Sequence, residues 1–422
     1  MGLYCSIFTT IKLAFAAWFL VWLSRLIYSL MVYSFIWEGA YIPLETSQFI
    51  EDQRRVANFD FLDDSKLQNR LIARAIPNQR LVKVFGIDNS FTTTNINTHR
   101  RFYRNVGRAL HGKRAEDWPR FFTAASTALN LILAQFADAR DSLPLAVLTR
   151  ELVFLTTLYS FFEVNIENVS LHDVRVATNA INDMWVHSKT IAQPDILQER
   201  QRELNAALLR MLPNEFPCSA ATHPMNIILP AYETMWRIVL LTFISAGFRD
   251  VDQETADQFR EVIQGVPECF EDGNSDNVAA MAMNFSKEGL RLYPPTKRIY
   301  RAFLDGPQMI ADIQKCHRDP DIWPNPEQFR PSRFLPGEFT ADMERAYLPF
   351  SIKPHKCPAA DKFAPHAIII LVVVLAKSLG TLESGATVRF RNDTLDRDRS
   401  ALLPSGRLDT EDWTLQMKDT SV

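Results

Sequence analysis

The feature that most constrains the fold is a change in sequence pattern near Leu292. From about residue 118 up to that point, apolar residues recur at spacings of three and four, as in Leu148, Leu152 and Leu155, which is the periodicity of helices packed on one face. After it, prolines become frequent between residues 294 and 336, and proline has no backbone N–H to donate within a helix or a central strand. The chain is therefore predicted to be mainly α with minor β structure, and to contain a long irregular segment after residue 292.

Individual elements can be placed by the same criteria. Apolar periodicity predicts helices within 118–164 and over about 173–193, 196–212, 224–248 and 365–379. The segment Leu81–Phe91, which Gly86 and Asn89 interrupt, is typical of a short strand or turn. Alternating residues predict short strands at 386–390 and 413–415, close to the C-terminus.

Composition excludes several classes of protein. The chain has 46 basic and 49 acidic residues and a net charge of −3, so it lacks the positive excess of nucleic-acid-binding proteins, and no nucleic-acid partner is expected. Hydrophobic residues make up 47% and charged residues 23%, as in a packed globular protein. The cysteines form no CxxC pair, which argues against a zinc site or a disulfide framework. They are Cys5, Cys218, Cys269, Cys316 and Cys357.

An apolar tract near the N-terminus predicts a membrane anchor. Leu13–Leu23 carries no charge, and a second apolar stretch, Leu26–Trp37, follows Arg25. A helix of about 20 apolar residues spans the hydrocarbon core of a bilayer. A charge at its centre costs about 2.5–3.5 kcal/mol, so the span is expected to end just before Arg25. We assign residues 1–38 to this anchor and 39–422 to the domain that follows; a cleaved signal peptide and a helix of the soluble core are the alternatives.

Three short segments hold the residues best suited to chemistry. Glu288 and Arg291 are three apart on a predicted helix, where a carboxylate and a guanidinium can pair. Arg333, in the proline-rich segment, could reach Glu288 through charge-assisted hydrogen bonds. Cys357 lies shortly before the helix at 365–379, and a helix N-terminus stabilises a thiolate. Taken singly, the pair would be an ordinary surface ion pair and the cysteine an ordinary buried thiol.

Together these segments resemble the cytochrome P450 family. The motifs ExxR, PxRF and FxxxxxxCxA follow in that order, at Glu288–Arg291, Pro331–Phe334 and Phe350–Ala359. Between the first motif and the cysteine, RLYPPTKRIYR and HRDPDIWPNPEQFRPSRF also look like segments of that family. The resemblance extends from about Asp60 to the C-terminus, is strongest after Met225, and is to fungal microsomal members, of which this would be a short and partly divergent one.

The resemblance implies a helical fold around haem b, the iron protoporphyrin IX group. Cys357 would be the axial ligand of the haem iron, and Phe350 would pack beside it. Arg301 and His355 would bind the haem propionates. Three further residues would form a structural ion network behind the haem: Glu288, Arg291 and Arg333.

The resemblance also implies a proton relay in the helix predicted at 224–248. Glu233 and Thr234 match an acid–alcohol pair of the family, in which a hydroxyl beside a carboxylate passes protons into an apolar pocket. The competing interpretation is a polar notch in a buried helix. Pro294–Thr296 would help to form the wall of the substrate pocket.

The chain departs from the family pattern at several points. Lys353 replaces the usual glycine of the cysteine segment, and His355 replaces the usual arginine. The Trp-x-x-x-Arg haem contact of an early helix has no clean match, and its nearest substitutes are His99, Tyr103 and Arg104. The chain is also short between the anchor and His99, where the first sheet is expected, and again near residues 304–309.

The implied function is that of a monooxygenase of secondary metabolism. It would hydroxylate or otherwise oxidise a lipophilic small molecule with O2 and electrons from NADPH–cytochrome P450 reductase. It would sit in the endoplasmic reticulum membrane by a single span, with its catalytic domain facing the cytosol. A haem-thiolate isomerase that needs no reductase is one alternative, and Glu233 with Thr234 argues against it. A degraded or truncated homologue with impaired haem binding is another, which Lys353 and the missing sheet segments favour.

Overall fold

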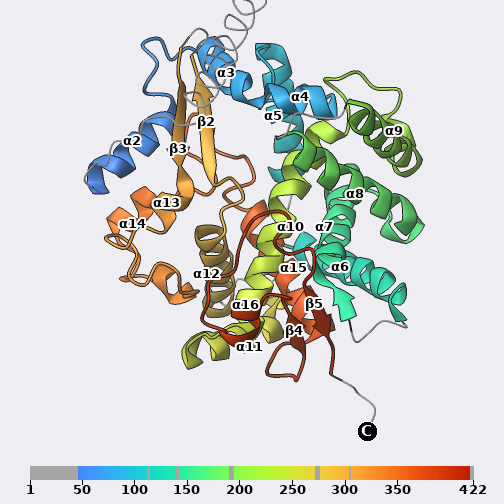
Figure 1. Ribbon diagram of the computed structural model, residues 1–422, viewed down its shortest axis with the longest axis vertical. Helices are drawn as coiled ribbons and strands as arrows, with labels where there is room; N and C mark the ends of the chain where they lie inside the picture. The colour runs from blue at the N-terminus through green and yellow to red at the C-terminus, as the bar shows by residue number, and fades with distance from the viewer. Residues whose placement is uncertain are drawn as a thin grey trace, which may run out of the picture.

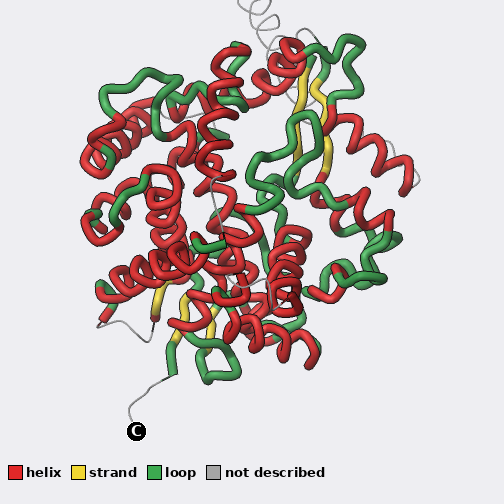
Figure 2. Tube along the Cα trace, turned by 180° about the vertical axis from the view of Figure 1, so that it is seen from behind, coloured by secondary structure: helices red, strands yellow, loops and turns green. Residues whose placement is uncertain are grey.

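The protein is mainly helical, with two small sheets (Figures 1 and 2). The computed structural model describes residues 46–111, 115–137, 142–189, 194–270, 276–303 and 306–418, so the anchor predicted at residues 1–38 lies outside the described residues. The helices are α2 (Thr46–Asn58), α3 (Leu67–Ala75), α4 (Gln79–Phe85), α5 (Ile96–His111), α6 (Asp117–Ala134), α7 (Leu145–Phe162), α8 (Leu171–His187), α9 (Pro194–Met211), α10 (Met225–Phe248), α11 (Gln253–Gly265), α12 (Asp276–Leu292), α13 (Ile313–His317), α14 (Ala341–Ala346), α15 (Phe363–Leu379) and α16 (Asp393–Arg397).

The centre of the main core is α10, which packs against α7, α12 and α15 and passes through the middle of the molecule in Figure 1. By length and composition, α7 and α10 are apolar enough to cross a membrane, but 78% and 72% of their most apolar windows are buried inside the protein. A helix that is apolar all round is stable in water only when neighbours cover it. These two helices are therefore core helices of the globular body, as their apolar spacing predicted.

Two small antiparallel sheets flank the helices. In one, β2 (Arg298–Ala302) pairs with β3 (Gln308–Asp312), and Ile299 lies opposite Ala311. In the other, β5 (Thr414–Gln416) lies between β1 (Leu143–Pro144) and β4 (Thr387–Arg389). Strands β4 and β5 confirm the two strands predicted near the C-terminus. The hairpin β2–β3 falls within the segment predicted to be irregular, and its buried side packs with α2 in a second, smaller core.

The structure corrects the prediction for Leu81–Phe91. Its first part belongs to helix α4, because Leu81, Val84 and Phe85 are buried on one face at spacings of three and four. The helix ends at Gly86, which adopts the left-handed conformation (φ 63°) and donates its N–H to the carbonyl of Val82. Glycine adopts this conformation readily because it has no Cβ. Gly86, which indicated a turn in the sequence, thus ends helix α4.

Candidate functional site

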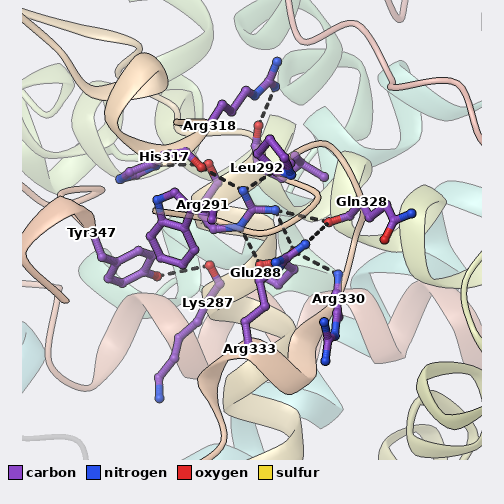
Figure 3. A network of polar contacts seen from close by, with 12 residues as sticks. Lys287, Glu288, Arg291, Leu292, His317, Arg318, Gln328, Arg330, Arg333 and Tyr347 are labelled. Carbon is purple, nitrogen blue, oxygen red and sulfur yellow. Dashed lines mark hydrogen bonds and ion pairs between the residues drawn. The ribbon is translucent and has the colours of Figure 1, made fainter. Parts of the chain in front are cut away.

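Glu288, Arg291 and Arg333 meet in one buried ion network (Figure 3). Arg291 donates from Nε and Nη2 to the two carboxylate oxygens of Glu288 at 2.7 and 2.8 Å. Arg333 donates from Nε to Glu288 Oε1 at 3.3 Å. Glu288 and Arg291 are 0% exposed and Arg333 is 2% exposed. The structure therefore brings together the three residues that the sequence grouped.

The network fastens the proline-rich loop to α12. Arg291 donates at 2.7 Å to the carbonyls of both His317 and Pro326. Arg333 donates to the carbonyls of Pro324 and Asn325. A loop without regular secondary structure must find other partners for its buried carbonyls, and the two guanidinium groups supply them. The loop conformation thus depends on charges that Glu288 balances.

His317, which the sequence analysis did not single out, links this network to the cysteine segment. Its Nδ1 lies 3.0 Å from the carbonyl of Arg291, and its Nε2 accepts the backbone N–H of Leu348 at 2.8 Å. Burial, together with the charge of Arg291, lowers the pKa of His317 to about 3. The imidazole is therefore neutral at physiological pH, with the proton on Nδ1 and the lone pair of Nε2 directed at Leu348.

Cys357 is held by backbone hydrogen bonds shortly before α15. Its N–H donates to the carbonyl of Phe350 at 3.0 Å, and its own carbonyl accepts the N–H of Ala360 at 3.1 Å. Burial raises the pKa of the Cys357 thiol, and a backbone hydrogen bond at Ala359 and the charge of Arg74 oppose that rise. A bound metal ion deprotonates a coordinating thiol outright.

A cluster of buried basic side chains lies beside Cys357; we call Arg74, Arg301 and His355 the cysteine-side cluster. They are 6%, 6% and 5% exposed. Arg74 Nη1 donates to Ser90 Oγ at 3.2 Å and lies 3.5 Å from His355 Nδ1. Arg301 Nη1 donates to the neighbouring carbonyl of Tyr300 at 2.8 Å, and no other hydrogen bond from its guanidinium is present among the described residues. Among the described residues, none of the three forms an ion pair with a carboxylate.

Two polar atoms of the cysteine-side cluster have unsatisfied hydrogen-bonding capacity in the described structure. Arg301 Nε and His355 Nε2 are buried and have no hydrogen-bond partner among the described residues. Burial, reinforced by the charge of Arg74, lowers the pKa of Arg301 to about 9 and that of His355 to about 3. An uncompensated buried charge costs several kcal/mol, so such sites are normally paired. The arrangement fits a bound anion with more than one negative oxygen.

The sequence anticipated Arg301 and His355 here but missed Arg74, which lies on α3 outside every motif. Of the three candidates on α5, His99 is buried, with Nδ1 2.9 Å from Ser90 Oγ and its ring 5.4 Å from that of His355. Tyr103 packs on His99 with 4.8 Å between ring centroids. Arg104 is exposed and does not join them.

Glu233 and Thr234 have separate partners. Glu233 is 2% exposed and forms an ion pair with Arg407 of the C-terminal segment. Thr234 Oγ1 donates to the carbonyl of Pro230, one turn earlier on α10, at 2.7 Å. Successive residues of a helix point about 100° apart, and no hydrogen bond joins this acid to this alcohol in the described structure. The ion pair with Arg407 was not foreseen from the sequence.

Comparison with known proteins matches the C-terminal part of the chain to one family. Residues 281–361, which include Glu288, Arg333 and Cys357, match the family model of cytochrome P450. Taurochenodeoxycholic 6 alpha-hydroxylase of Sus scrofa is 37% identical over 21% of this chain and 19% of its own. Cytochrome P450 3A29 of Sus scrofa is 28% identical over 49% of this chain and 44% of its own. The chain thus spans less than half the length of these curated relatives.

Solved structures extend the likeness to most of the molecule. The haem domain of cytochrome P450DA superimposes with a TM-score of 0.56 and 15% identity, over 87% of this chain and 84% of its own. A 6-coordinated cytochrome P450 from Thermus thermophilus gives a TM-score of 0.52 at 15% identity, over 73% and 82%. The fold is thus similar to that of these cytochrome P450 structures. Residues 281–361 match the cytochrome P450 family, and the fold of most of the chain is similar to that of solved cytochrome P450 structures.

The residues present fit the haem-thiolate cofactor that this family implies. Haem carries two propionate carboxylates, and the cysteine-side cluster offers buried donors, two of them without a partner, beside the one cysteine of the C-terminal motif. Cys357 would hold the iron, while Arg301, His355 and Arg74 would hold the carboxylates.

Proposed function

We propose that this protein is a haem-thiolate monooxygenase that oxidises a lipophilic small molecule in secondary metabolism. It would take electrons from NADPH–cytochrome P450 reductase and use O2. The observation that carries the proposal is the group of buried basic side chains beside Cys357, which have no carboxylate ion partner in the described part of the chain. When bound, haem b would supply the oxygen chemistry, and the thiolate ligand donates electron density that favours cleavage of the O–O bond.

In this proposal the chain's own residues position the cofactor and keep its surroundings dry. Cys357 binds the iron, and Phe350, whose carbonyl holds the Cys357 N–H, packs near it. Arg74, Arg301 and His355 neutralise the propionates. The ion network of Glu288 holds the loop before the cysteine segment, and His317 connects the two by its hydrogen bond to Leu348.

The membrane and the redox partner belong to the same proposal. The apolar tract of residues 1–38 would anchor the chain in the endoplasmic reticulum membrane by a single span, with the catalytic domain in the cytosol. That arrangement would place the domain beside a membrane-bound reductase and close to lipophilic molecules dissolved in the bilayer.

A difference spectrum of the reduced, carbon-monoxide-bound protein tests the proposal. The full chain, expressed in the presence of a haem precursor, should show the strongly red-shifted Soret band of a thiolate-ligated haem. A band at the position typical of a histidine-ligated haem, or haem content near zero, would contradict the assignment of Cys357. The second result would favour a degraded homologue.

The ion pair between Glu233 and Arg407 favours a second candidate, a haem-thiolate isomerase that needs no reductase. A carboxylate neutralised by arginine is a poor proton donor, because its charged form is stabilised. Reductase-dependent NADPH oxidation separates the two. The monooxygenase should consume NADPH faster than reductase alone, whereas the isomerase should leave the rate of reductase alone unchanged.

A further inference from the structure

A second set of basic side chains gathers around α10, away from the cysteine-side cluster. Its members come from five separate parts of the chain: α4, the end of α8, α10, the segment before β2, and the C-terminal segment. We call it the α10 cluster. It consists of Arg80, Lys189, Arg237, Lys297 and Arg407.

One half of the α10 cluster is assembled on Trp185 of α8. The guanidinium of Arg80 lies 4.9 Å from the centroid of the Trp185 ring, and that of Arg407 lies 5.1 Å from it. Arg80 Nη1 also donates to Ser188 Oγ at 2.6 Å, which places Arg80 beside Lys189. Two arginines on one indole are favourable as cation–π contacts, but they bring like charges together.

The other half is assembled along α10. Glu233, the ion partner of Arg407, lies one helical turn before Arg237. Arg237 Nη2 donates to the carbonyl of Pro295 at 3.2 Å, two residues before Lys297. In Figure 1, α8 and strand β2 lie on opposite sides of α10, so the cluster bridges the two sides of this helix.

Positive charge is in excess in the α10 cluster. Glu233 is committed to Arg407, and Asp409, which interacts with Lys297, is exposed and accepts the backbone N–H of Gly406. In the described part of the chain, no ion pair joins Arg80, Arg237 or Lys297 to a carboxylate, and Arg237 Nε is buried without a partner.

Burial lowers the pKa of Arg237, Lys189 and Lys297, and like charges of the cluster contribute for the two lysines. Burial lowers the pKa of Arg237 to about 10. Burial, followed by the charge of Arg80, lowers the pKa of Lys189. Burial, followed by the charge of Arg237, lowers the pKa of Lys297. A bound anion would oppose all three shifts, because an opposite charge nearby favours the charged form.

The α10 cluster lies beside the segment Pro294–Thr296, which is expected to form a wall of the substrate pocket. Arg237 is three residues beyond Thr234 on α10, and its partner Pro295 belongs to the segment expected to form a wall of the substrate pocket. The charges of the α10 cluster also do not act on His355 of the cysteine-side cluster. The charges that act on His355 are those of Arg74, His99, Arg70 and Arg301, none of which belongs to the α10 cluster.

We propose that the α10 cluster binds the anionic head group of the substrate, so that the preferred substrates are apolar molecules carrying one carboxylate or phosphate. Arg237 and Lys297 make the direct contacts, since neither has a carboxylate ion-pair partner among the described residues, while Arg80 and Arg407 supply charge from the Trp185 side. The planar guanidinium of arginine matches the two oxygens of such a group. This inference rests on the proposed function and on the expectation that Pro294–Thr296 forms a wall of its substrate pocket.

The test is calorimetric binding of three probes with the same chain length below their micellar concentrations: dodecanoate, dodecyl phosphate and dodecanol. The wild-type chain should bind at least one anion about tenfold to a hundredfold more tightly than dodecanol, as charge-assisted hydrogen bonds imply. Comparison of the two anions identifies the head group. Arg237→Gln and Lys297→Gln should each lose most of that preference, and Arg237→Lys should retain part of it.

Lys83→Gln is the matched control, because Lys83 is an exposed lysine of α4, the helix that also carries Arg80. It should bind all three probes as the wild type does. Equal affinity for dodecanol and both anions in the wild type would overturn the inference, as would an unchanged preference in both glutamine variants. Haem content and the reduced spectrum are recorded separately for each variant. A normal reduced spectrum together with equal binding of anions and dodecanol therefore rejects this inference alone. Absence of haem rejects the proposed function, and the calorimetric binding of the probes then still decides whether the anion site exists.

Discussion

Replacing Glu288 with glutamine removes the carboxylate on which the loop network depends. Glu288 accepts two hydrogen bonds from Arg291, one from Arg333 and one from the backbone N–H of Arg330. Glu288→Gln keeps the size of the side chain and leaves two buried guanidinium groups without a counter-charge. Breaking a buried ion pair in this way costs about 3–5 kcal/mol, a large part of a typical free energy of unfolding of about 5–15 kcal/mol.

Glu383→Gln is the matched control. Glu383 also forms a two-point pair with an arginine, Arg260, at 2.8 and 3.2 Å, but both side chains are about half exposed, at 51% and 47%. Exposed pairs contribute roughly 0–1 kcal/mol. The assay is urea unfolding of the full chain in detergent, followed by circular dichroism. Equal losses of unfolding free energy in the two variants would refute the reasoning, because they would show that burial of the Glu288 network does not matter.

Three further predictions follow from the site. Because the pKa of His317 is lowered to about 3 in the folded protein from about 6.5 when unfolded, unfolding takes up a proton in the window between these values. The contribution of His317 to the free energy of unfolding should therefore fall by about 1.4 kcal/mol for each pH unit below pH ~6. The urea midpoint of His317→Gln should then depend less steeply on pH than that of the wild type. Parallel pH curves for the two proteins would exclude His317 as the cause. Thr234→Ala should leave haem content and spectrum intact, because in the described part of the chain the Thr234 hydroxyl donates to the Pro230 carbonyl of its own helix. If Thr234 also passes protons, product formation should slow by about 10²–10⁴-fold while NADPH consumption continues, so the ratio of product to NADPH should fall. An unchanged ratio would make Thr234 a helix residue without a relay role. Arg301→Gln should weaken haem binding by about tenfold to a hundredfold, which corresponds to one charge-assisted hydrogen bond. Haem transfer to apomyoglobin measures this affinity. Transfer as slow as from the wild type would exclude Arg301 from the propionate site.

The sequence predicted the parts of the fold that depend on local pattern. The core helices follow from apolar spacing, and the Glu288–Arg291 pair follows from a separation of three on a helix. The hairpin β2–β3 was missed because its prolines and polar flanks resemble a loop. Its strands are stabilised by contacts with α2, more than 200 residues earlier in the chain.

The site residues that could not be predicted from the sequence, Arg74 and Arg407, make contacts between distant segments. Arg74 on α3 reaches His355, and Arg407 reaches Glu233 on α10. Neither arginine belongs to a motif, and a single sequence gives no sign of which buried charges will meet. The second contact matters most, because it gives the carboxylate expected to relay protons an ion partner of its own.

The central claim is that Cys357 is the axial ligand of a haem. The most direct measurement is the haem content and reduced carbon-monoxide spectrum of Cys357→Ala beside Cys218→Ala, a control at another partly buried free cysteine. Cys218→Ala should contain one haem per chain with a thiolate-type Soret band, whereas Cys357→Ala should lose that band, because no other side chain in the segment supplies a thiolate. A thiolate-type band of full intensity in Cys357→Ala would contradict the account.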